Sequence, residues 1–263
     1  MFPTRFYALL LLLLACLPVS AQDFPYQLDW KKEAVILGTG GLISGVAHAI
    51  EKDLPGLTAE EIATLNPATV SAFDRGATRQ MNGNYRKLSD KLLNASVVTP
   101  GLLLLGKPAR SKPLVLGVMM AETFLVTEGL TKMGKVIVRR NRPFTYNPDF
   151  SLGEQTNNDA RQSFPSGHTS ITAGFSFFAA KVFHDLHPDS KARPFVWAGA
   201  ALLPAATGYA RYRAGKHFPT DILVGYALGA TVGILIPELH KTPGERGLSV
   251  DVTGNGLGLV YKW

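Results

Sequence analysis

The sequence predicts an all-α protein: a helical bundle with several short membrane-spanning helices, followed by a small C-terminal β-hairpin. Long apolar stretches rich in Ala, Gly and Leu recur along the chain without the period-two alternation that marks strands. Gly225, Gly229 and Gly233 recur every fourth residue on one predicted helix face, a spacing that suits close helix packing. The glycine-rich segment 38–45 lacks a P-loop lysine, so it also indicates helix packing.

Six apolar stretches are predicted as helices and candidate spans. They cover residues 34–50, 95–106, 113–130, 169–183, 195–210 and 222–237. A span needs about 20 residues, so these stretches are short for crossing a bilayer. Segment 95–106 is the weakest candidate, since Pro100 and Gly101 interrupt it. If it does not cross, two spans precede Lys135, and an exported N-terminus places the following loop outside the cytoplasm. The basic run 132–142 favours the opposite orientation under the positive-inside rule.

The N-terminus is typical of a secretory signal peptide. A basic start, an apolar run over 6–17 and a small residue at Ala21 predict a leader over residues 1–21, cleaved after Ala21. The alternative is a lipoprotein signal at Cys16, the single cysteine of the chain. Both readings export the protein, and cleavage of the leader removes any possibility of a disulfide.

Residues 22–93 are predicted to contain one helix and then a polar insert. The insert, residues 51–93, is mixed in charge, carries turn signals and is expected to lie outside the membrane. Thr58 and Glu61 have the spacing of a helix-capping box.

The helical core is predicted over residues 94–240 and the tail over 241–263. Alternating residues on both sides of Gly254-Asn255-Gly256 predict a β-hairpin within the tail.

The balance of charge is basic, with a formal net charge of +7. Such a charge favours anionic partners. Arg139 and Arg140 lack an accompanying aromatic platform, so we expect no nucleic acid partner. We interpret them as contacts for anionic lipid or for the substrate's charged group.

The segment Pro165-Ser166-Gly167-His168 precedes a predicted helix. Ser166 is a good N-cap, and the free N–H groups and positive dipole end of a helix favour an anion there. A phosphate could therefore contact Ser166 and the nearby amides, with His168 beside it. Alone, this segment would be read as an ordinary capped turn.

His217 and Asp221 are one helical turn apart, so both can face the same way. Pro219 marks the expected start of that helix. We expect Asp221 to accept a hydrogen bond from one ring nitrogen of His217, which leaves the other nitrogen free to attack phosphorus. No third ligand has the spacing of a zinc site here. The remaining histidines, including His240, are interpreted as surface or packing residues.

Three cations complete the set. Lys135 and Arg142 are seven residues apart, two turns of a helix expected to continue from 113–130 until Pro143 ends it. Arg211 is the third. Guanidinium groups bind phosphate oxygens with two hydrogen bonds and stay charged. Phosphoryl transfer depends on such positioning and charge stabilisation, so no metal cofactor is expected.

Taken together, Lys-x6-Arg-Pro, Pro-Ser-Gly-His and Arg-x5-His-x3-Asp resemble the motifs of the type 2 phosphatidic acid phosphatase (PAP2) superfamily. The resemblance covers about residues 113–237 and implies a PAP2-type helical bundle, in the branch of bacterial membrane-associated lipid phosphatases. It implies a two-step phosphatase that needs no metal. Ala210 departs from the pattern, because the family usually has a serine before the arginine of the third motif.

The resemblance also implies a role for each site residue. His217 would be the nucleophile that forms a phosphohistidine, and Asp221 would orient it. His168 would protonate the leaving alcohol and then activate water. The phosphate-binding residues would be Lys135, Arg142, Ser166, Gly167 and Arg211.

The leading functional hypothesis is an exported membrane phosphatase, with a periplasm-facing site, that acts on an anionic phospholipid or a polyprenyl phosphate. Undecaprenyl diphosphate, phosphatidylglycerol phosphate, phosphatidic acid and a lipid A phosphate are the candidate substrates. A soluble periplasmic acid phosphatase is the first alternative, supported by charges inside the helices at Glu122, Glu128 and Lys181. A vanadium haloperoxidase and a non-catalytic lipid binder are the others. A binder would need the cations but not both histidines.

Overall fold

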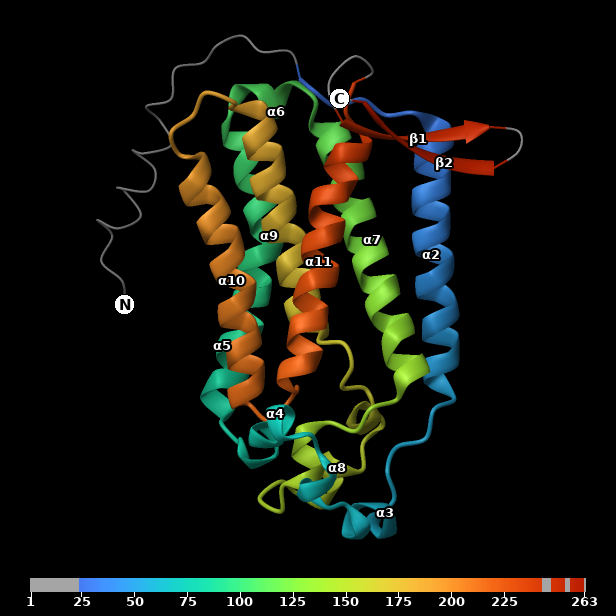
Figure 1. Ribbon diagram of the computed structural model, residues 1–263, viewed down its shortest axis with the longest axis vertical. Coiled ribbons are helices and arrows are strands. Elements are labelled where there is room, and N and C mark those ends of the chain that lie inside the picture. The colour runs from blue at the N-terminus through green and yellow to red at the C-terminus, as the bar shows by residue number, and fades with distance from the viewer. Residues whose placement is uncertain (1–23, 243–246, 254–255, 263) are drawn as a thin grey trace.

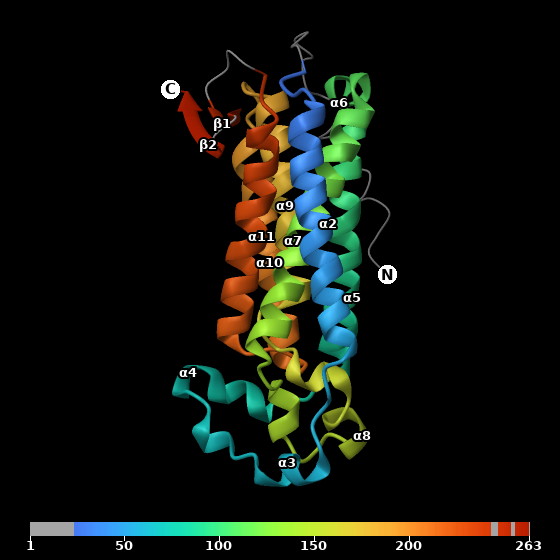
Figure 2. The ribbon, with the colours of Figure 1, turned by 90° about the vertical axis from the view of Figure 1, so that its right-hand side faces the viewer.

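Within the part of the chain that the structure describes, six long helices lie side by side and alternate in direction (Figures 1 and 2). The computed structural model describes residues 24–242, 247–253 and 256–262, so the predicted leader lies outside the described residues. The long helices are α2 (Trp30–Lys52), α5 (Gly83–Val98), α7 (Pro113–Val138), α9 (Gly167–Leu186), α10 (Arg193–Arg213) and α11 (Pro219–Leu239). The predicted helical bundle is confirmed.

Short elements connect these helices. The short α-helices are α3 (Ala59–Thr64), α4 (Ala72–Arg75), α6 (Lys107–Ser111) and α8 (Leu152–Gln155). The 3₁₀ turns are η1 (Pro67–Thr69), η2 (Gly76–Arg79), η3 (Thr99–Leu105), η4 (Pro143–Tyr146) and η5 (Asn158–Arg161). Helices α3, α4 and α8 gather at the lower end of the bundle in Figure 1, whereas α6 lies at the upper end. The lower end therefore carries most of the irregular chain.

Local sequence sets several of the helix ends. Asp29 caps α2 by accepting from the backbone of Lys31 at 2.9 Å. The predicted capping box between Thr58 and Glu61 forms at the start of α3. Pro219 occupies the first turn of α11, as predicted.

The end of α7 differs from the prediction. The helix stops at Val138, because Arg139 adopts the left-handed conformation with φ of 49°. Arg142 is extended and precedes η4. Lys135 and Arg142 therefore do not share one helix, and the chain turns between them.

Helix α9 is the central helix and contacts α5, α7, α10 and α11. The predicted glycine ladder of α11 faces it. A Cβ atom at Gly229 would lie 2.0 Å from the carbonyl oxygen of Ser170, and one at Gly225 would lie 2.6 Å from that of Ser166. Only glycine permits this approach, so the ladder sets how closely α11 packs on α9.

The glycines of α2 behave differently from the prediction. A Cβ atom at Gly38, Gly41 or Gly45 would meet nothing within 4 Å. Gly40 packs on α7, where a Cβ atom would lie 3.3 Å from Val126. One glycine of the segment therefore serves helix packing.

The largest apolar cluster lies among α7, α9 and α11. It includes Leu116, Met119, Phe178, Val182 and Ile236, all buried. Full burial of such a side chain contributes about 1.5–3 kcal/mol, so this cluster anchors the three helices that carry most of the motifs.

Four of the described helical segments are long and apolar enough to cross a membrane. They are Trp30–Lys52, Gly83–Leu105, Pro113–Tyr146 and Pro219–Leu239. The expected spans at 169–183 and 195–210 are not among them.

The second of these segments corrects two predictions. Residues 83–93 were predicted as part of the polar insert, and 95–106 as the weakest of the candidate spans. The structure joins them in one apolar segment, Gly83–Leu105. Three candidate spans therefore precede the loop after Lys135, one more than the count of two that leaves out 95–106.

Near the C-terminus, strands β1 (Gly247–Thr253) and β2 (Gly256–Lys262) pair in antiparallel register, with Gly247 opposite Lys262 and Thr253 opposite Gly256. The predicted turn at 254–255 and the terminal Trp263 lie outside the described residues.

Candidate active site

The three motifs meet at the lower end of the bundle in Figure 1. Lys135 lies in the last turn of α7, and Arg211 lies in that of α10. Ser166 precedes the first turn of α9, and Asp221 lies in the first turn of α11. The alternating helix directions bring these four helix ends together.

His217 is buried between α10 and α11, with 1% of its surface exposed. Its Nδ1 lies 2.7 Å from the carbonyl oxygen of Ser163, and its Nε2 lies 3.1 Å from Nη1 of Arg142. A carbonyl can only accept and a guanidinium can only donate, so we assign the proton to Nδ1. Nε2 is left with a lone pair that faces a cation.

Electrostatics keep this ring neutral. Burial, followed by the charges of Arg142, Lys135 and Arg211, holds the pKa of His217 well below its usual range. A neutral imidazole with an available lone pair is the state that a nucleophilic histidine requires.

Asp221 does not bind His217 directly, contrary to the prediction. Its Oδ2 lies 3.7 Å from Nδ1 of His217, beyond hydrogen-bond distance. Oδ2 instead accepts from the hydroxyl of Ser163 at 2.5 Å and from the backbone N–H of Phe218 at 2.9 Å. Asp221 therefore fixes Ser163 by its hydroxyl, and Ser163 holds His217 by its carbonyl.

Arg140 was predicted to contact anionic lipid or the substrate's charged group. In the structure it lies inside this network instead. Its guanidinium donates to Oδ1 of Asp221 at 2.5 Å and to Oδ2 of Asp74 at 2.8 Å. Asp74, at 3% exposed, also accepts from the backbone and hydroxyl of Thr220. The polar insert, which contains Asp74, is thus tied to the start of α11.

Lys135 and Arg142 are held beside His217 by loop 139–166. Nζ of Lys135 donates to the carbonyl oxygen of Gln162 at 2.6 Å. Arg142 donates to the carbonyl oxygen of Asp159 at 2.9 Å and also pairs with the Asp159 carboxylate. Both cations are buried, and among the described residues only Asp159 gives this pair a direct carboxylate partner.

Arg211 is the least satisfied of the three cations. It is 7% exposed, and Nη1 lies 3.5 Å from the Ser89 hydroxyl and 3.9 Å from Oδ1 of Asp90. Its buried Nε has no hydrogen-bond partner within the described part of the chain. Burial and the charge of Arg142 lower the pKa of Arg211 to about 9. A buried cation in this state favours a bound anion.

A further lysine adds to the positive charge. Lys216 lies over the ring of Phe144, with Nζ 4.2 Å from its centre. Burial and Arg142 lower the pKa of Lys216 to about 8.

His168 is the most accessible of the predicted catalytic groups, with 28% of its side chain exposed. Its Nε2 lies 2.9 Å from Oδ1 of Asp90. Burial and then Arg211 lower the pKa of His168 to about 4, although Asp90 acts in the opposite direction. In the free protein the ring is therefore neutral at pH 7.

Ser166 and Gly167 form the start of α9. The backbone N–H of Ser166 donates to the carbonyl oxygen of Asp221 at 3.0 Å, and its hydroxyl pairs with that of Thr169 at 2.9 Å. Ser166 occupies the predicted N-cap position but makes no side-chain cap bond. A Cβ atom at Gly167 would lie 3.8 Å from Cε of Lys135. The predicted phosphate-binding residues are thus brought together.

Sequence reasoning missed Ser163, Asp159, Asp74 and Asp90, and it gave Arg140 a different role. Ser163 and Asp159 lie in the same loop as the second motif, which could have signalled them. Asp74 and Asp90 come from segments outside the motifs, and nothing in their sequence pattern points to the site.

Comparison with known families fits this geometry. The family model described as "PAP2 superfamily" matches residues 112–244, just over half of the chain. The chain belongs to the PAP2 superfamily. The matched region contains α7, α9, α10 and α11, the helices whose ends form the site.

Two curated relatives are similar over part of their length. An undecaprenyl-diphosphatase from Sulfolobus acidocaldarius is 25% identical over 142 residues, which is 54% of this chain and 61% of that protein. A lipid A 4'-phosphatase from Porphyromonas gingivalis is 25% identical over 145 residues, covering 54% of this chain and 58% of the relative. The chain therefore spans about three fifths of these relatives.

A solved structure is also similar. It is the crystal structure of a transmembrane PAP2-type phosphatidylglycerolphosphate phosphatase from Bacillus subtilis, 21% identical in sequence. The superposition covers 78% of this chain and 94% of that one, with a TM-score of 0.42.

Proposed function

We propose that this protein is a metal-independent phosphatase that hydrolyses the phosphate or diphosphate ester of a lipid through a phosphohistidine at His217. One observation carries the proposal. The neutral Nε2 of His217 faces a group of buried cations that is short of carboxylate partners. Such a group stabilises the charge on phosphoryl oxygens while the nitrogen attacks.

In the first step, Nε2 of His217 attacks phosphorus and the ester P–O bond breaks. Lys135, Arg142 and Arg211 hold the phosphoryl oxygens. His168 gives its proton to the leaving oxygen. A phosphate bound beside Arg211 offsets the charge that lowers the pKa of His168, so substrate binding raises that pKa and favours the protonated ring.

In the second step, water attacks the phosphohistidine and the P–N bond breaks. His168, now neutral, accepts a proton from the water. Inorganic phosphate leaves, and His217 returns to its starting tautomer. The carbonyl of Ser163 keeps the proton on Nδ1 through both steps.

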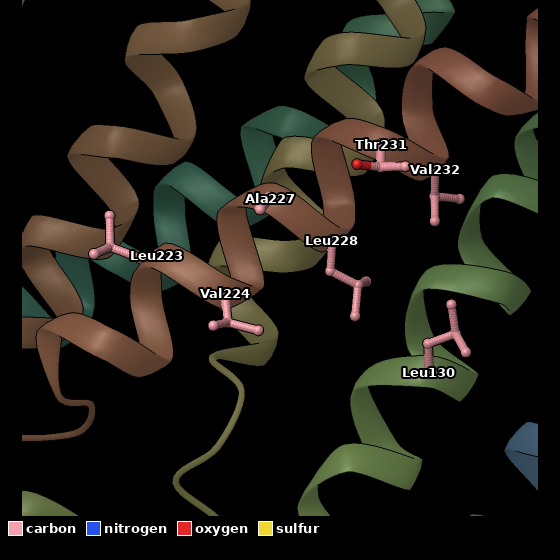
Figure 3. Close-up of a pocket in the computed structure, with 7 residues that line it drawn as sticks. All are labelled: Leu130, Leu223, Val224, Ala227, Leu228, Thr231 and Val232. Atoms are coloured by element: carbon pink, nitrogen blue, oxygen red, sulfur yellow. The ribbon is translucent and has the colours of Figure 1, made fainter.

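An apolar groove supports a lipid substrate. It lies between α7 and α11, where Leu130, Leu223, Val224 and Leu228 line it together with Ala227, Thr231 and Val232 (Figure 3). Leu223 follows Asp221 by two residues, and Leu130 lies just over one turn before Lys135, so the groove begins at the level of the site along the two helices. We assign it to the hydrocarbon chain of the substrate. The names of the two relatives, an undecaprenyl-diphosphatase and a lipid A 4'-phosphatase, agree with this substrate class.

The charges inside the helices at Glu128 and Lys181 are compatible with a membrane protein. Each is turned toward another helix of the bundle. Lys181 pairs with Asp185 and Glu238. Glu128 accepts from Ser44 and lies 3.1 Å from His48. Paired charges that face the bundle are compatible with a lipid-facing exterior, so they no longer support the soluble alternative.

We propose that the site faces the exported side of the membrane. Helices α2, α5 and α7 alternate in direction, so Trp30 and the site lie on opposite sides if all three cross. An exported site then requires Trp30 on the cytoplasmic side. A leader cleaved after Ala21 would reverse this arrangement.

The test is phosphate release in excess EDTA from lipid and water-soluble phosphomonoesters and diphosphates. The His217→Ala variant is assayed alongside, with its melting temperature as the control for folding. We expect turnover that survives EDTA, is higher for lipid esters and is lost in the variant. When the reaction is quenched in alkali, labelled phosphate from the substrate should be found on the wild-type protein. Equal release by a folded variant would overturn the proposal.

A further inference from the structure

A second cluster of ionisable side chains lies at the opposite end of the bundle from the site (Figure 1). Glu33 comes from the first turn of α2, Glu122 from α7, and His240 directly follows α11. One ligand atom from each lies within 4.8 Å of the other two. Glu122 and Lys135 are 13 residues apart on α7, or about 20 Å, so this cluster does not touch the site.

His240, which was predicted as a surface or packing residue, is fully buried, and a hydrogen bond at Nδ1 fixes its ring. Nδ1 lies 2.7 Å from the carbonyl oxygen of Ile236, so it donates its proton there. Nε2 then points toward two carboxylates, 2.9 Å from Oε2 of Glu33 and 3.1 Å from Oε2 of Glu122. A lone pair facing two carboxylates is repulsive, so a cation must lie between them: a second proton or a metal ion.

Glu122 favours the metal ion. The residue is fully buried, yet neither carboxylate oxygen makes a hydrogen bond within the described residues, and the contact with His240 lacks hydrogen-bond geometry. No lysine or arginine of the described chain pairs with Glu33 or Glu122. An imidazolium would leave Oε1 of Glu122 bare, whereas a divalent ion can bind either carboxylate oxygen and balances both charges.

The geometry also suits a metal. In a tetrahedral zinc site with bonds of about 2.0 Å, ligand atoms lie about 3.3 Å apart, close to the separations here. A histidine that ligates a metal usually donates its other N–H to a carbonyl or carboxylate, as His240 does to Ile236. Glu33 is likewise fixed, because its Oε1 accepts from the backbone N–H of Asp29 at 2.7 Å.

We propose that Glu33, Glu122 and His240 bind one divalent transition-metal ion that ties together α2, α7 and α11. One nitrogen and two carboxylate ligands are suited to Zn²⁺ and related ions. The ion is structural in this proposal, because the cluster lies far from the phosphate-binding residues. It joins the N-terminal helix to the helices of the catalytic core.

The test uses the full chain purified in detergent, stripped with EDTA and then dialysed against Zn²⁺. We expect about one zinc per chain by elemental analysis, and a rise in melting temperature of about 5 °C or more on adding zinc. Glu122→Gln and His240→Gln should each lose both effects. His187→Gln, a half-buried histidine at the same end of the bundle, should keep both.

Phosphatase activity in EDTA shows that each variant is folded. Because this activity is measured separately from zinc binding, a failure of the metal proposal can be told apart from a failure of the proposed function. We expect all three variants to retain it at a temperature below their melting points. Zinc absent from the wild type, or bound equally by an active Glu122→Gln variant, would overturn the proposal and leave His240 as an imidazolium between two carboxylates.

Discussion

The carbonyl oxygen of Ser163 lies 2.7 Å from Nδ1 of His217, closer than the carboxylate of Asp221, whose Oδ2 is 3.7 Å away. A backbone group therefore fixes the tautomer of the proposed nucleophile. Asp221 acts one step removed, through the hydroxyl of Ser163. This relationship makes Asp221 a positioning residue, and it predicts a graded effect of mutation.

Asp221→Asn should reduce kcat by about 10–100-fold, in the range found for outer partners of functional residues. The loss should be smaller than in His217→Ala, because the Ser163 carbonyl still holds Nδ1. KM should change little. Asp149→Asn, an exposed change near the same end, is the control. A loss equal to that of His217→Ala would contradict an indirect role.

Asp90→Asn should move the basic limb of the kcat/KM profile to lower pH by about one unit. Asp90 raises the pKa of His168 against burial and Arg211, so removing its charge lowers that pKa further. The proton that His168 gives to the leaving group is then lost at lower pH. A pH profile on one lipid ester measures the shift. Asp189→Asn, at the other end of the bundle, should leave it unchanged, and a shift to higher pH in Asp90→Asn would refute this assignment.

Gly229→Ala should destabilise the protein by about 1–3 kcal/mol, because its Cβ atom would meet the Ser170 carbonyl at 2.0 Å and force α11 away from α9. Gly41→Ala is the matched control. Nothing lies within 4 Å of a Cβ atom there, so this change should stabilise helix α2 by about 0.5–1 kcal/mol. Denaturant titration of both variants in detergent compares them. If Gly229→Ala stabilised the protein and Gly41→Ala destabilised it, the close packing of α11 on α9 would be contradicted.

Asp149→Cys and Lys191→Cys test the membrane arrangement. Both positions are exposed, at opposite ends of the bundle. Cys16 is the single native cysteine, so it is replaced by serine in both variants. With a membrane-impermeant maleimide on intact cells or spheroplasts, we expect labelling at position 149, next to the site, and labelling at 191 only after permeabilisation. Labelling of both without permeabilisation would support an exported soluble protein. Labelling at 191 alone would place the site in the cytoplasm.

Ala227→Phe should fill the groove between α7 and α11. We expect kcat/KM for a long-chain lipid ester to fall about tenfold or more, as expected for a loss of 1.4 kcal/mol or more in binding. Activity on a short water-soluble ester should not change. Ala198→Phe, an exposed alanine on α10, is the matched control. An equal fall for both substrates would mean that the groove does not hold the lipid chain.

The sequence by itself determined the family and the helical fold class, and it predicted site residues that the structure brings together at one end of the bundle. These follow from side-chain chemistry and local spacing, because phosphoryl transfer requires particular groups and helices require particular periodicities. The glycine ladder of α11 is another example, since close packing excludes any side chain at Gly225 and Gly229.

Only the tertiary structure decided what surrounds those residues. The Ser163 carbonyl is a backbone group with no sequence signature, and its contact with His217 joins residues 54 positions apart. Asp74 reaches Thr220 across 146 residues, and Glu33 reaches His240 across 207. Such contacts depend on how the antiparallel helices align their ends, which is a property of the packed bundle and not of any local segment.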